Sequence, residues 1–491
     1  MASFNDTSHR PYSRRPSSVV RIGNVVVGGD NPVAIQSMTN TPTLDTDASV
    51  DQICRIADAG ADIVRLTAQT PAHAANLGEI RRKVRALRYG LPLVADIHFT
   101  PAAAFVAAEN VEKVRINPGN FAIEKFPVFA ELCRERGVAV RIGVNHGSLS
   151  SRIMERFGDT PEGMVESAME FLRICRDVDF NDVVVSIKAS NVIVMTETVR
   201  LLCEAMEAEG MSFPLHLGVT EAGDAEDGRI KSAVGIGSLL ADGIGDTIRV
   251  SLTEAPEREI PVARMILNHV ASRAGQPALG EGRVVDMVPP EGIVLVRGLD
   301  DVPVDVADVR VEHPNIIDKA VAAFPAGAKA GVTAVYPASM SAEEVMIAAA
   351  VDLGYLLLKY PLSAVAVEAP ALDKEASVRL ALDILQATRR RISKTEYIAC
   401  PSCGRTLFDL QTTLAKVKEA TAGLKGLKIG VMGCIVNGPG EMADADYGYV
   451  GAGPGKVSLY RGKECVEKNI PAEEALPRLI ELIRNDGYKV G

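Results

Sequence analysis

The chain has 491 residues, which is too long for one ordinary hydrophobic core, so we expect several domains. Hydrophobic residues make up 47% and charged residues 24%, and no apolar run approaches the roughly 18 to 20 residues of a membrane helix, which predicts a globular protein without a membrane partner. The net charge of −10 argues against a nucleic-acid partner, because affinity for a phosphate backbone comes from clustered lysine and arginine.

The N-terminal segment 1–18 is polar, with several arginines and serines, and no apolar stretch of about 7 to 15 residues follows it to make a secretory signal. We predict a flexible tail, disordered or loosely docked, with a short organellar transit segment as the alternative. The eight cysteines are sparse for this length, unlike the dense pattern of small secreted scaffolds. This usage predicts a reducing cytoplasm.

Eight short β-rich runs follow in the first half of the chain, and segments with helical spacing separate them. Such alternation is typical of a parallel sheet in an α/β protein. Eight units within about 250 residues predict a closed (β/α)₈ TIM-like barrel over residues 19–276, with a doubly wound open sheet as the alternative. The eight runs are 32–37, 61–67, 91–97, 112–117, 138–144, 182–189, 213–219 and 245–252.

Basic side chains stand near the C-terminal ends of five of these runs, where valine, isoleucine and leucine normally fill a barrel. Any one of them could be half of a structural ion pair, for instance with Asp96. Five charges converging on one barrel mouth would be costly without an anionic ligand. We therefore predict a phosphorylated ligand, and a diphosphate rather than a carboxylate, because arginine forks suit phosphate oxygens. The five residues are Arg65, Arg115, Arg141, Lys188 and Arg249.

Polar side chains accompany these cations at the C-terminal strand ends, where barrel enzymes have their active sites. For the neutral ones, capping a loop or turn is the alternative role. Glu221, in GVTEAG, is the one carboxylate at a strand end among these cations. The opposite charges should keep it ionised unless the effect of burial, which favours the neutral form, is larger. A general acid or base role for it competes with a structural ion pair. The neutral residues are Gln36, Ser37, His98, Asn117, Asn145, His146, Ser190, Asn191 and Ser251.

The residue pattern changes between Gly280 and Pro370, and we predict a small α/β insert or spacer domain over 277–375. Ser341 and Glu344 form a capping box that opens an alanine-rich helix. No cysteine lies in this domain, so it supplies no thiolate ligand. Strands are expected at 283–288, 292–298 and 333–337, and residues 371–391 read as a helix with basic residues in its last turn.

Cys400 and Cys403 form a C-x-x-C pair between an expected strand and an expected helix. A thioredoxin-like redox pair shows the same arrangement, but it would leave Cys434 unexplained. A zinc ribbon would need a second such pair or a histidine, and no histidine follows residue 400. A pair of buried thiols without a metal is a further alternative.

The third cysteine, Cys434, follows an expected strand, and the tight turn at 437–440 could bring Glu441 back beside it. Three thiolates and one carboxylate are an unusual set, since iron–sulfur clusters ordinarily have four cysteine ligands. A carboxylate is the harder and more easily displaced ligand. The residues alone therefore indicate a candidate cluster with one replaceable ligand, in a C-terminal α/β domain over 376–491.

Five separated motifs, in this order, closely resemble the 4-hydroxy-3-methylbut-2-enyl diphosphate synthase family of the methylerythritol phosphate route to isoprenoids. The resemblance covers 14–275 and 375–491. It implies an oxidoreductase that reductively opens 2-C-methyl-D-erythritol 2,4-cyclodiphosphate, expels water and forms the linear allylic diphosphate, with single electrons from ferredoxin or flavodoxin. The motifs are RRPSSVVRIGNVVVGGDNPVAIQSMTNTPTLD, VRIGVNHGSL, LHLGVTEAG, CPSCGRT and GCIVNGPGE.

The resemblance also implies the site residues. The family holds a [4Fe–4S] cluster with three cysteines and a glutamate, which correspond to Cys400, Cys403, Cys434 and Glu441. Glu221 would then donate or relay a proton near the departing hydroxyl, and the substrate diphosphate would lie in the basic barrel mouth. The binding residues so implied are Arg65, Arg115, Asn117, Arg141, Asn145, Lys188, Ser190, Arg249 and Ser251.

A barrel mouth alone is wet, so the cluster domain must close over a barrel as a lid. Many bacterial members of the resembled family close between the two chains of a homodimer, whereas plant-type members carry a large middle domain. The segment 277–375 resembles that middle domain in position but looks shorter. The sequence therefore leaves open whether the lid closes within one chain or between two.

Two functions of other classes also remain open. One is a barrel lyase or transferase for a phosphorylated substrate, with a structural zinc ion in the C-terminal domain. The other is a non-catalytic protein that binds a phosphorylated metabolite.

Overall fold

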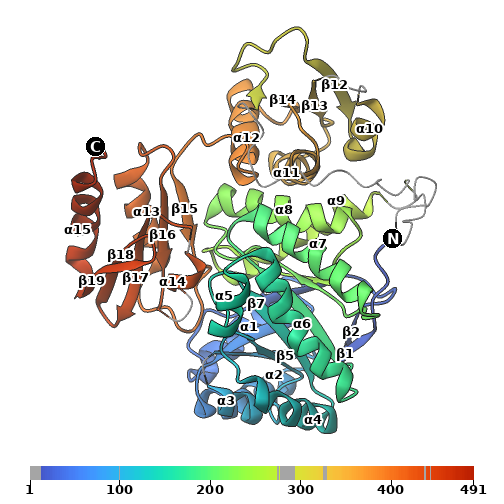
Figure 1. Cartoon of the computed structure of the whole chain (residues 1–491), viewed down its shortest axis with the longest axis vertical. Helices are drawn as coiled ribbons and strands as arrows, with labels where there is room; N and C mark the ends of the chain where they lie inside the picture. Colours follow the sequence, from blue (N-terminus) through green and yellow to red (C-terminus); the bar gives the residue numbers. More distant parts are fainter. Residues whose placement is uncertain are drawn as a thin grey trace.

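The computed structural model describes residues 13–98, 100–273, 276, 294–324, 329–435, 438–442 and 444–490. Figure 1 shows a large barrel, drawn in blue and green, a smaller sheet with its helices above it, and a third sheet beside it in orange and red. The α/β class and the order of barrel, insert and C-terminal unit agree with the predicted fold.

Eight parallel strands form the barrel sheet, in the order β8-β7-β6-β5-β4-β3-β10-β9. A bridge between Val185 of β8 and Leu215, just before β9, joins the two edges of this sheet. The barrel prediction is confirmed, and the alternative of an open sheet is wrong. Each expected run overlaps one strand, and β3, β4 and β7 extend one residue beyond their runs. These are β3 (Ala34–Met38), β4 (Ile63–Ala68), β5 (Leu93–Ile97), β6 (Lys113–Ile116), β7 (Ala139–Asn145), β8 (Val183–Lys188), β9 (His216–Leu217) and β10 (Thr247–Ile248).

Helices between the strands surround the barrel (Figure 1). Thr70 and Thr160 begin two of them as N-caps, each accepting a backbone N–H three residues on, and a proline follows each cap. Proline suits the first helical position because its fixed φ is helical and its missing N–H would have no partner there. The helices are α1 (Thr46–Asp58), α2 (Pro71–Ala86), α3 (Pro101–Ala107), α4 (Phe126–Arg136), α5 (Ser151–Phe157), α6 (Pro161–Asp177), α7 (Val192–Ala208), α8 (Ala225–Ala241) and α9 (Glu259–Ala271).

A small hairpin, β1 (Val20–Ile22) with β2 (Val25–Val27), packs against the first residues of several barrel strands. Just before it, Arg14 donates to the Asn31 carbonyl at 2.6 Å, and Ser17 donates to Asp246 at 2.8 Å. Residues 13–18 of the expected tail are therefore held against the barrel, while residues 1–12 lie outside the described residues.

The insert has a parallel sheet in the order β11-β14-β13-β12. The capping box of Ser341 and Glu344 is confirmed at the start of α11. The expected strand at 283–288 lies outside the described residues, β11 and β13 lie within or overlap the other two, and β12 and β14 were not predicted. The elements are β11 (Leu295–Val296), β12 (Ala307–Glu312), α10 (Ile316–Ala323), β13 (Ala330–Val335), α11 (Ala342–Lys359), β14 (Ala364–Glu368) and α12 (Lys374–Ala387).

The helix expected over 371–391 is present as α12, but the prediction that basic residues occupy its last turn is wrong. The helix ends at Ala387, and Arg389 has a left-handed φ of 52°, so the arginines lie in the connection beyond it. They serve tertiary contacts instead, since Arg391 donates to Asp300 at 2.6 Å and Arg390 donates to the Leu357 carbonyl at 3.0 Å.

The C-terminal unit has five strands in the order β15-β16-β17-β18-β19, and its first three strands are parallel. Cys400 directly follows β15, and one residue separates Cys434 from the end of β16. Because these two strands are adjacent and parallel, both cysteines lie at the same edge of the sheet. In the described part of the chain, no helix is both long and apolar enough to cross a bilayer. The elements are β15 (Glu396–Ala399), α13 (Leu410–Thr421), β16 (Lys428–Met432), α14 (Gly438–Glu441), β17 (Tyr447–Gly453), β18 (Lys456–Arg461), β19 (Glu464–Pro471) and α15 (Ala472–Asn485).

Candidate functional site

The C-terminal unit covers the mouth of its own barrel. A backbone bridge pairs Ala222, after β9, with Ala399 at the end of β15. Beside it, the buried Lys231 on α8 donates to the buried Glu396 on β15 at 2.9 Å. A second cross-link joins Lys418 on α13 to Asp224 at 2.6 Å. These contacts show the lid closed within one chain, which the sequence had left open.

Two glycine contacts allow this closure. A Cβ on Gly147, in the loop after β7, would lie 2.1 Å from the carbonyl oxygen of Gly440 in α14. A Cβ on Gly404, in the CPSCGRT loop, would lie 2.5 Å from the carbonyl oxygen of Thr41. No real side chain tolerates such distances, so glycine at these positions lets the two backbones touch.

One cavity lies between the barrel mouth and the lid, and residues from both line it. The barrel contributes the five predicted cations together with Asn145, Glu221 and Ser251. The lid contributes all three predicted cluster cysteines. The full lining is Met38, Arg65, Asp96, His98, Arg115, Arg141, Asn145, Ser186, Lys188, Thr220, Glu221, Arg249, Ser251, Cys400, Pro401, Ser402, Cys403, Arg405, Thr406, Met432 and Cys434.

Two predicted site residues, Asn117 and Ser190, are not among the described residues of this lining, and a third, Glu441, is not described there. Asn117 serves a turn after β6, where it donates to Ser148 at 3.0 Å and accepts from the Gly119 N–H at 3.0 Å. Ser190 is buried just after β8. Glu441 lies at the end of α14, and its side chain is outside the described part of the structure. The predicted roles of these three residues stay predictions.

Other polar residues that the sequence analysis singled out support loops or helices. Ser37 donates to the buried carboxylate of Glu259 at 2.9 Å. Asn191 is the N-cap of α7. His146 lies 3.6 Å from Asp159 in the loop after β7. These contacts agree with the alternative role, in which such residues cap helices or support loops.

Two of the five cations have carboxylate partners, which agrees with the alternative that some of them belong to structural ion pairs. Arg115 on β6 forms an ion pair with Asp96 at 3.3 Å. Arg249, after β10, forms a two-pronged pair with Glu259 at 3.1 and 3.3 Å. All four residues are at most 3% exposed. Because a buried charge needs a partner, these pairs stabilise the wall of the site rather than leave both guanidinium groups to a ligand.

Arg65 and Arg141 have no carboxylate partner among the residues that the structure describes. The Nη2 and Nε groups of Arg65 point at the sulfur of Met38, a weak acceptor, at 2.8 and 3.1 Å. The Nε and Nη1 groups of Arg141 are buried and have no hydrogen-bond partner among the described residues. Burial lowers the pKa of Arg141 well below its ordinary range, and the neighbouring Arg65 and Arg115 lower it further. The unmet donors fit an anionic ligand with several oxygens.

Lys188 and Glu221 line the same cavity. Burial lowers the pKa of Lys188 well below its ordinary value, as do nearby arginines, while Glu221 opposes the effect. Glu221 is 3% exposed and has a left-handed φ of 47°. It also acts on Cys400, whose pKa is raised first by burial and further by the Glu221 charge. Such backbone conformations in non-glycine residues cluster at functional sites.

His98 is neutral in this site. Burial lowers the pKa of His98 to about 3, although Asp96 opposes this. Arg115 Nη1 lies 2.7 Å from His98 Nε2, and a guanidinium can only donate, so Nε2 accepts and the ring proton sits on Nδ1. The 3.2 Å approach of Nε2 to Asp96 is then not a second hydrogen bond.

The three cysteines in the lining form no disulfide in the described structure. Cys400 Sγ accepts the Gly433 N–H at 3.2 Å, and Cys403 Sγ accepts from Arg405 at 3.3 Å. Donors aimed at sulfur stabilise thiolates and tune iron–sulfur clusters. The residues present therefore fit a three-thiolate site whose open side faces the barrel. A two-cysteine redox pair would leave Cys434 without a role at this edge.

Arg405 is a residue that the sequence analysis missed. Its guanidinium donates to Cys403 Sγ at 3.3 Å and lies 3.4 Å from Asp96 of the barrel. Burial alone would lower the pKa of Arg405, but Cys403 and Asp96 together raise it above its ordinary range. Its position directly after CPSCG was the only signal, and nothing local shows that it reaches across to the barrel.

Two family models match the chain. The GcpE TIM-barrel domain matches residues 17–264, and the GcpE protein C-terminal domain matches residues 396–485.

Curated relatives match almost the whole chain, and each of those compared here has the name 4-hydroxy-3-methylbut-2-en-1-yl diphosphate synthase (flavodoxin). The protein from Parabacteroides distasonis is 45% identical and matches over 99% of both chains. The protein from Bacteroides fragilis strain YCH46 is 48% identical, over 97% of this chain and 96% of its own. The protein from Leptospira interrogans is 40% identical over 97% of both chains. With its barrel, its lid and nearly its full length matched, the chain belongs to the GcpE family of 4-hydroxy-3-methylbut-2-en-1-yl diphosphate synthases.

Proposed function

We propose that the protein converts 2-C-methyl-D-erythritol 2,4-cyclodiphosphate to (E)-4-hydroxy-3-methylbut-2-enyl diphosphate by two-electron reductive ring opening with loss of water. The observation that carries this proposal is that one cavity between the barrel and the lid of the same chain brings Arg141, whose buried donors have no partner among the described residues, together with three cysteines that form no disulfide there. Cations alone would suit a lyase or a binding protein, and cysteines alone would suit a structural metal. Together they suit a redox reaction on an anionic substrate. The names of the relatives support the same reaction.

The cofactor in this proposal is a [4Fe–4S] cluster held by Cys400, Cys403 and Cys434, with Glu441 as the fourth ligand. When bound, it supplies single electrons and a Lewis-acidic iron with a displaceable oxygen ligand. The cavity, free thiols and N–H donors support three of these ligands. The assignment of Glu441 rests on the family motif alone.

The substrate diphosphate is bound by the cations that have no carboxylate partner among the described residues. Arg141 and Arg65 have buried donors aimed at no carboxylate, and Lys188 lies among them. Arg115 and Arg249 contribute to the positive potential of the cavity, and their ion pairs with Asp96 and Glu259 hold their side chains in place. Asn145 Oδ1 accepts from Arg115 at 3.0 Å, which orients that amide beside the diphosphate. Binding through several fixed cations holds the reacting carbon in one orientation toward the cysteines.

Glu221 is the proposed proton donor. It lies within the electrostatic reach of both Lys188 and Cys400, so it sits between the diphosphate cations and the thiolate edge. Loss of the hydroxyl as water consumes a proton, and a carboxyl group at this place can supply it. The closed lid excludes bulk water, which prevents unspecific loss of the electrons.

Flavodoxin is the proposed electron donor, because the names of the relatives specify it, with ferredoxin as the other donor that the sequence analysis allowed. We place the protein in the cytoplasm, in agreement with eight free cysteines. The described site takes its walls from one chain, so a homodimer is compatible with the fold without being needed to complete those walls.

Spectroscopy on anaerobically purified protein tests this function. The expected result is about four irons and four sulfides per chain, with absorption that bleaches on dithionite addition and an EPR signal that changes when the cyclodiphosphate is added. Turnover of the cyclodiphosphate with dithionite should follow. Colourless protein with stoichiometric zinc would instead support the lyase or transferase. Tight binding without turnover by cluster-loaded protein would support the binding protein.

A further inference from the structure

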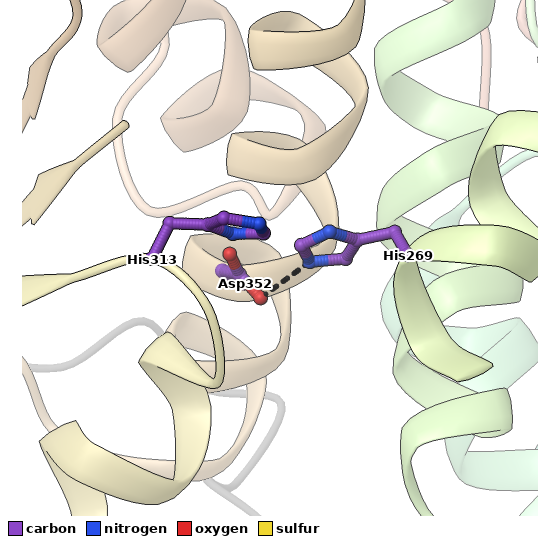
Figure 2. Close-up of side chains that lie close together, drawn as sticks. All are labelled: His269, His313 and Asp352. Atoms are coloured by element: carbon purple, nitrogen blue, oxygen red, sulfur yellow. Dashed lines mark hydrogen bonds and ion pairs between the residues drawn. The ribbon is translucent and has the colours of Figure 1, made fainter. Parts of the chain in front are cut away.

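A second cluster of metal-ligating side chains lies where the insert contacts the barrel, far in sequence from the cysteines (Figure 2). His269 is near the end of α9, the last helix of the barrel segment. Asp352 lies midway along α11 of the insert, and His313 directly follows β12. Three segments that are separate in sequence therefore meet at one place.

The two imidazole rings face each other over the Asp352 carboxylate (Figure 2). Their centroids are 5.6 Å apart, and His269 Nε2 lies 2.8 Å from Asp352 Oδ1. Each residue offers one ligand atom, and these three atoms lie within 4.8 Å of one another. Tyr336 donates to the other carboxylate oxygen at 2.9 Å. Such an outer hydrogen bond orients a ligating carboxylate.

Two buried polar atoms at this place have no hydrogen-bond partner in the described structure, His313 Nδ1 and Asn315 Oδ1. A small cavity of about 10 Å³ lies beside the cluster, and His269, Asp352 and Asn315 line it. A cavity of this size suits one water molecule or one ion. A nitrogen atom and an oxygen atom without hydrogen-bond partners in the described structure therefore lie near a space that could hold an ion.

We propose that His269, His313 and Asp352 bind one divalent transition-metal ion of the zinc class, with the fourth position facing the small cavity. Two imidazoles and one carboxylate suit zinc, whereas calcium and magnesium prefer oxygen ligands throughout. Ligands about 2.0 Å from a tetrahedral zinc lie roughly 3.3 Å apart, so the three atoms must approach one another by side-chain rotation. Both histidines are only partly buried, which leaves room for that movement.

The ion would tie the insert to the barrel. Nearby pairs already join the same surfaces, since Arg273 beyond α9 pairs with Asp318 of α10 at 2.6 Å. The insert also carries α12, which contacts α8 and precedes the lid. A metal at this joint therefore stabilises the platform from which the lid extends. The proposed metal site does not depend on the reaction proposed above.

The test uses the full-length, cluster-loaded protein after treatment with a mild chelator, titrated with zinc sulfate by calorimetry without oxygen. We expect one equivalent to bind to the wild type and to His73→Ala, a control histidine on α2. Binding should weaken at least about 100-fold in His313→Ala, the usual upper range for loss of a ligand or its support. Zinc should raise the Tm of the wild type and the control but not of His313→Ala. Equal isotherms for wild type and His313→Ala would overturn the proposal.

X-ray absorption at the zinc edge distinguishes this site from the cysteines. One equivalent of zinc in the wild type should show nitrogen and oxygen neighbours at about 2.0 Å, while sulfur neighbours at about 2.3 Å would mean that thiolates hold the ion and would refute the assignment. If His313→Ala does not fold, Asp352→Asn keeps the side-chain shape and removes the charge. Retained zinc affinity in that variant would likewise contradict the site.

Discussion

Arg405 of the lid and Asp96 of the barrel lie 3.4 Å apart, and the same guanidinium donates to the sulfur of Cys403. One side chain thus connects a predicted cluster ligand with the carboxylate that also pairs with Arg115. The position of the lid and the arrangement of the barrel cations are therefore coupled through a buried ion network.

Replacing Arg405 by methionine should lower kcat/KM about 10- to 150-fold, because one or two charged hydrogen bonds worth about 1.5 to 3 kcal/mol are lost. The cluster should also lose its colour faster in air, since Cys403 no longer receives this donor. Steady-state kinetics and the rate of bleaching measure both effects. Arg461→Met is the matched control, because Arg461 is an exposed arginine that pairs with Asp486 on the outer side of the lid. Equal kinetics in the two variants would remove Arg405 from the site.

Gly147→Ala should keep the lid from closing, because its Cβ would lie 2.1 Å from the Gly440 carbonyl oxygen. We expect activity to fall by about 100-fold or more, as for a misplacement of about 1 Å in a catalytic site. Gly137→Ala is the control. It also has a left-handed φ, of 63° against 76° for Gly147, but nothing lies within 4 Å of its Cβ. Both variants should lose similar stability from backbone strain, so a comparable loss of activity in the control would show that strain alone is responsible.

Arg141→Met should weaken binding of the cyclodiphosphate by about 1.5 to 3 kcal/mol or more. The same change should leave the ligand-free protein equally stable or more stable, because it removes a buried charge with two unmet donors. Arg115→Met should instead lower the stability by about 1.5 to 3 kcal/mol, since Asp96 loses one charged hydrogen bond but keeps Arg405 as an ion-pair partner. Calorimetric binding and denaturant unfolding measure the two quantities. A wild-type isotherm for the Arg141 variant would contradict its role.

Cys434→Ser should remove or degrade the iron chromophore, because the hydroxyl is a poor substitute for a thiolate. Cys465→Ser is the control, since Cys465 lies on β19 and outside the cavity lining in the described structure. Visible absorption and iron analysis of both proteins check this. An unchanged spectrum in Cys434→Ser would refute its assignment as a ligand.

Asp242→Asn should loosen the insert from the barrel. Asp242 ends α8, accepts from Arg200 at 2.9 Å, and also pairs with Lys359 of α11. Burial alone would raise the pKa of Asp242, but Arg200 and Lys359 lower it below its ordinary value of 3.8. Because the folded-state pKa is the lower one, the pair stabilises the fold above pH 3.8, and this contribution disappears as the pH falls through the folded-state pKa.

The variant should therefore lose about 3 kcal/mol of unfolding free energy at pH 7, and its difference from the wild type should shrink as the pH is lowered below 4. Denaturant unfolding at a series of pH values measures this difference. A difference that stays constant with pH would show that lost packing, not lost charge, is the cause.

Much of the fold could be predicted because its signals are local. Each barrel strand, such as VAVRIGV before Asn145, is a short apolar run between turn signals, and such runs need no distant residue to be recognised. Strands β12 and β14 were missed, although β12 alternates charged, exposed residues with buried valines, as a half-buried edge strand does. The arginines after α12 were misplaced because a helix ends where tertiary contacts, here those of Arg390 and Arg391, compete with further turns.

The sequence by itself determined the eight βα units, the placement of Cys400 and Cys434 each after a strand, and the motifs that resemble one family. Only the tertiary structure decided that Arg115 and Arg249 are paired, that Arg65 and Arg141 are not, and that the lid closes over its own barrel. The physical reason is the separation along the chain of the residues that decide each feature. Secondary structure follows from neighbours along the chain, whereas the partner of a buried charge depends on which distant side chains the folded backbone brings within about 4 Å.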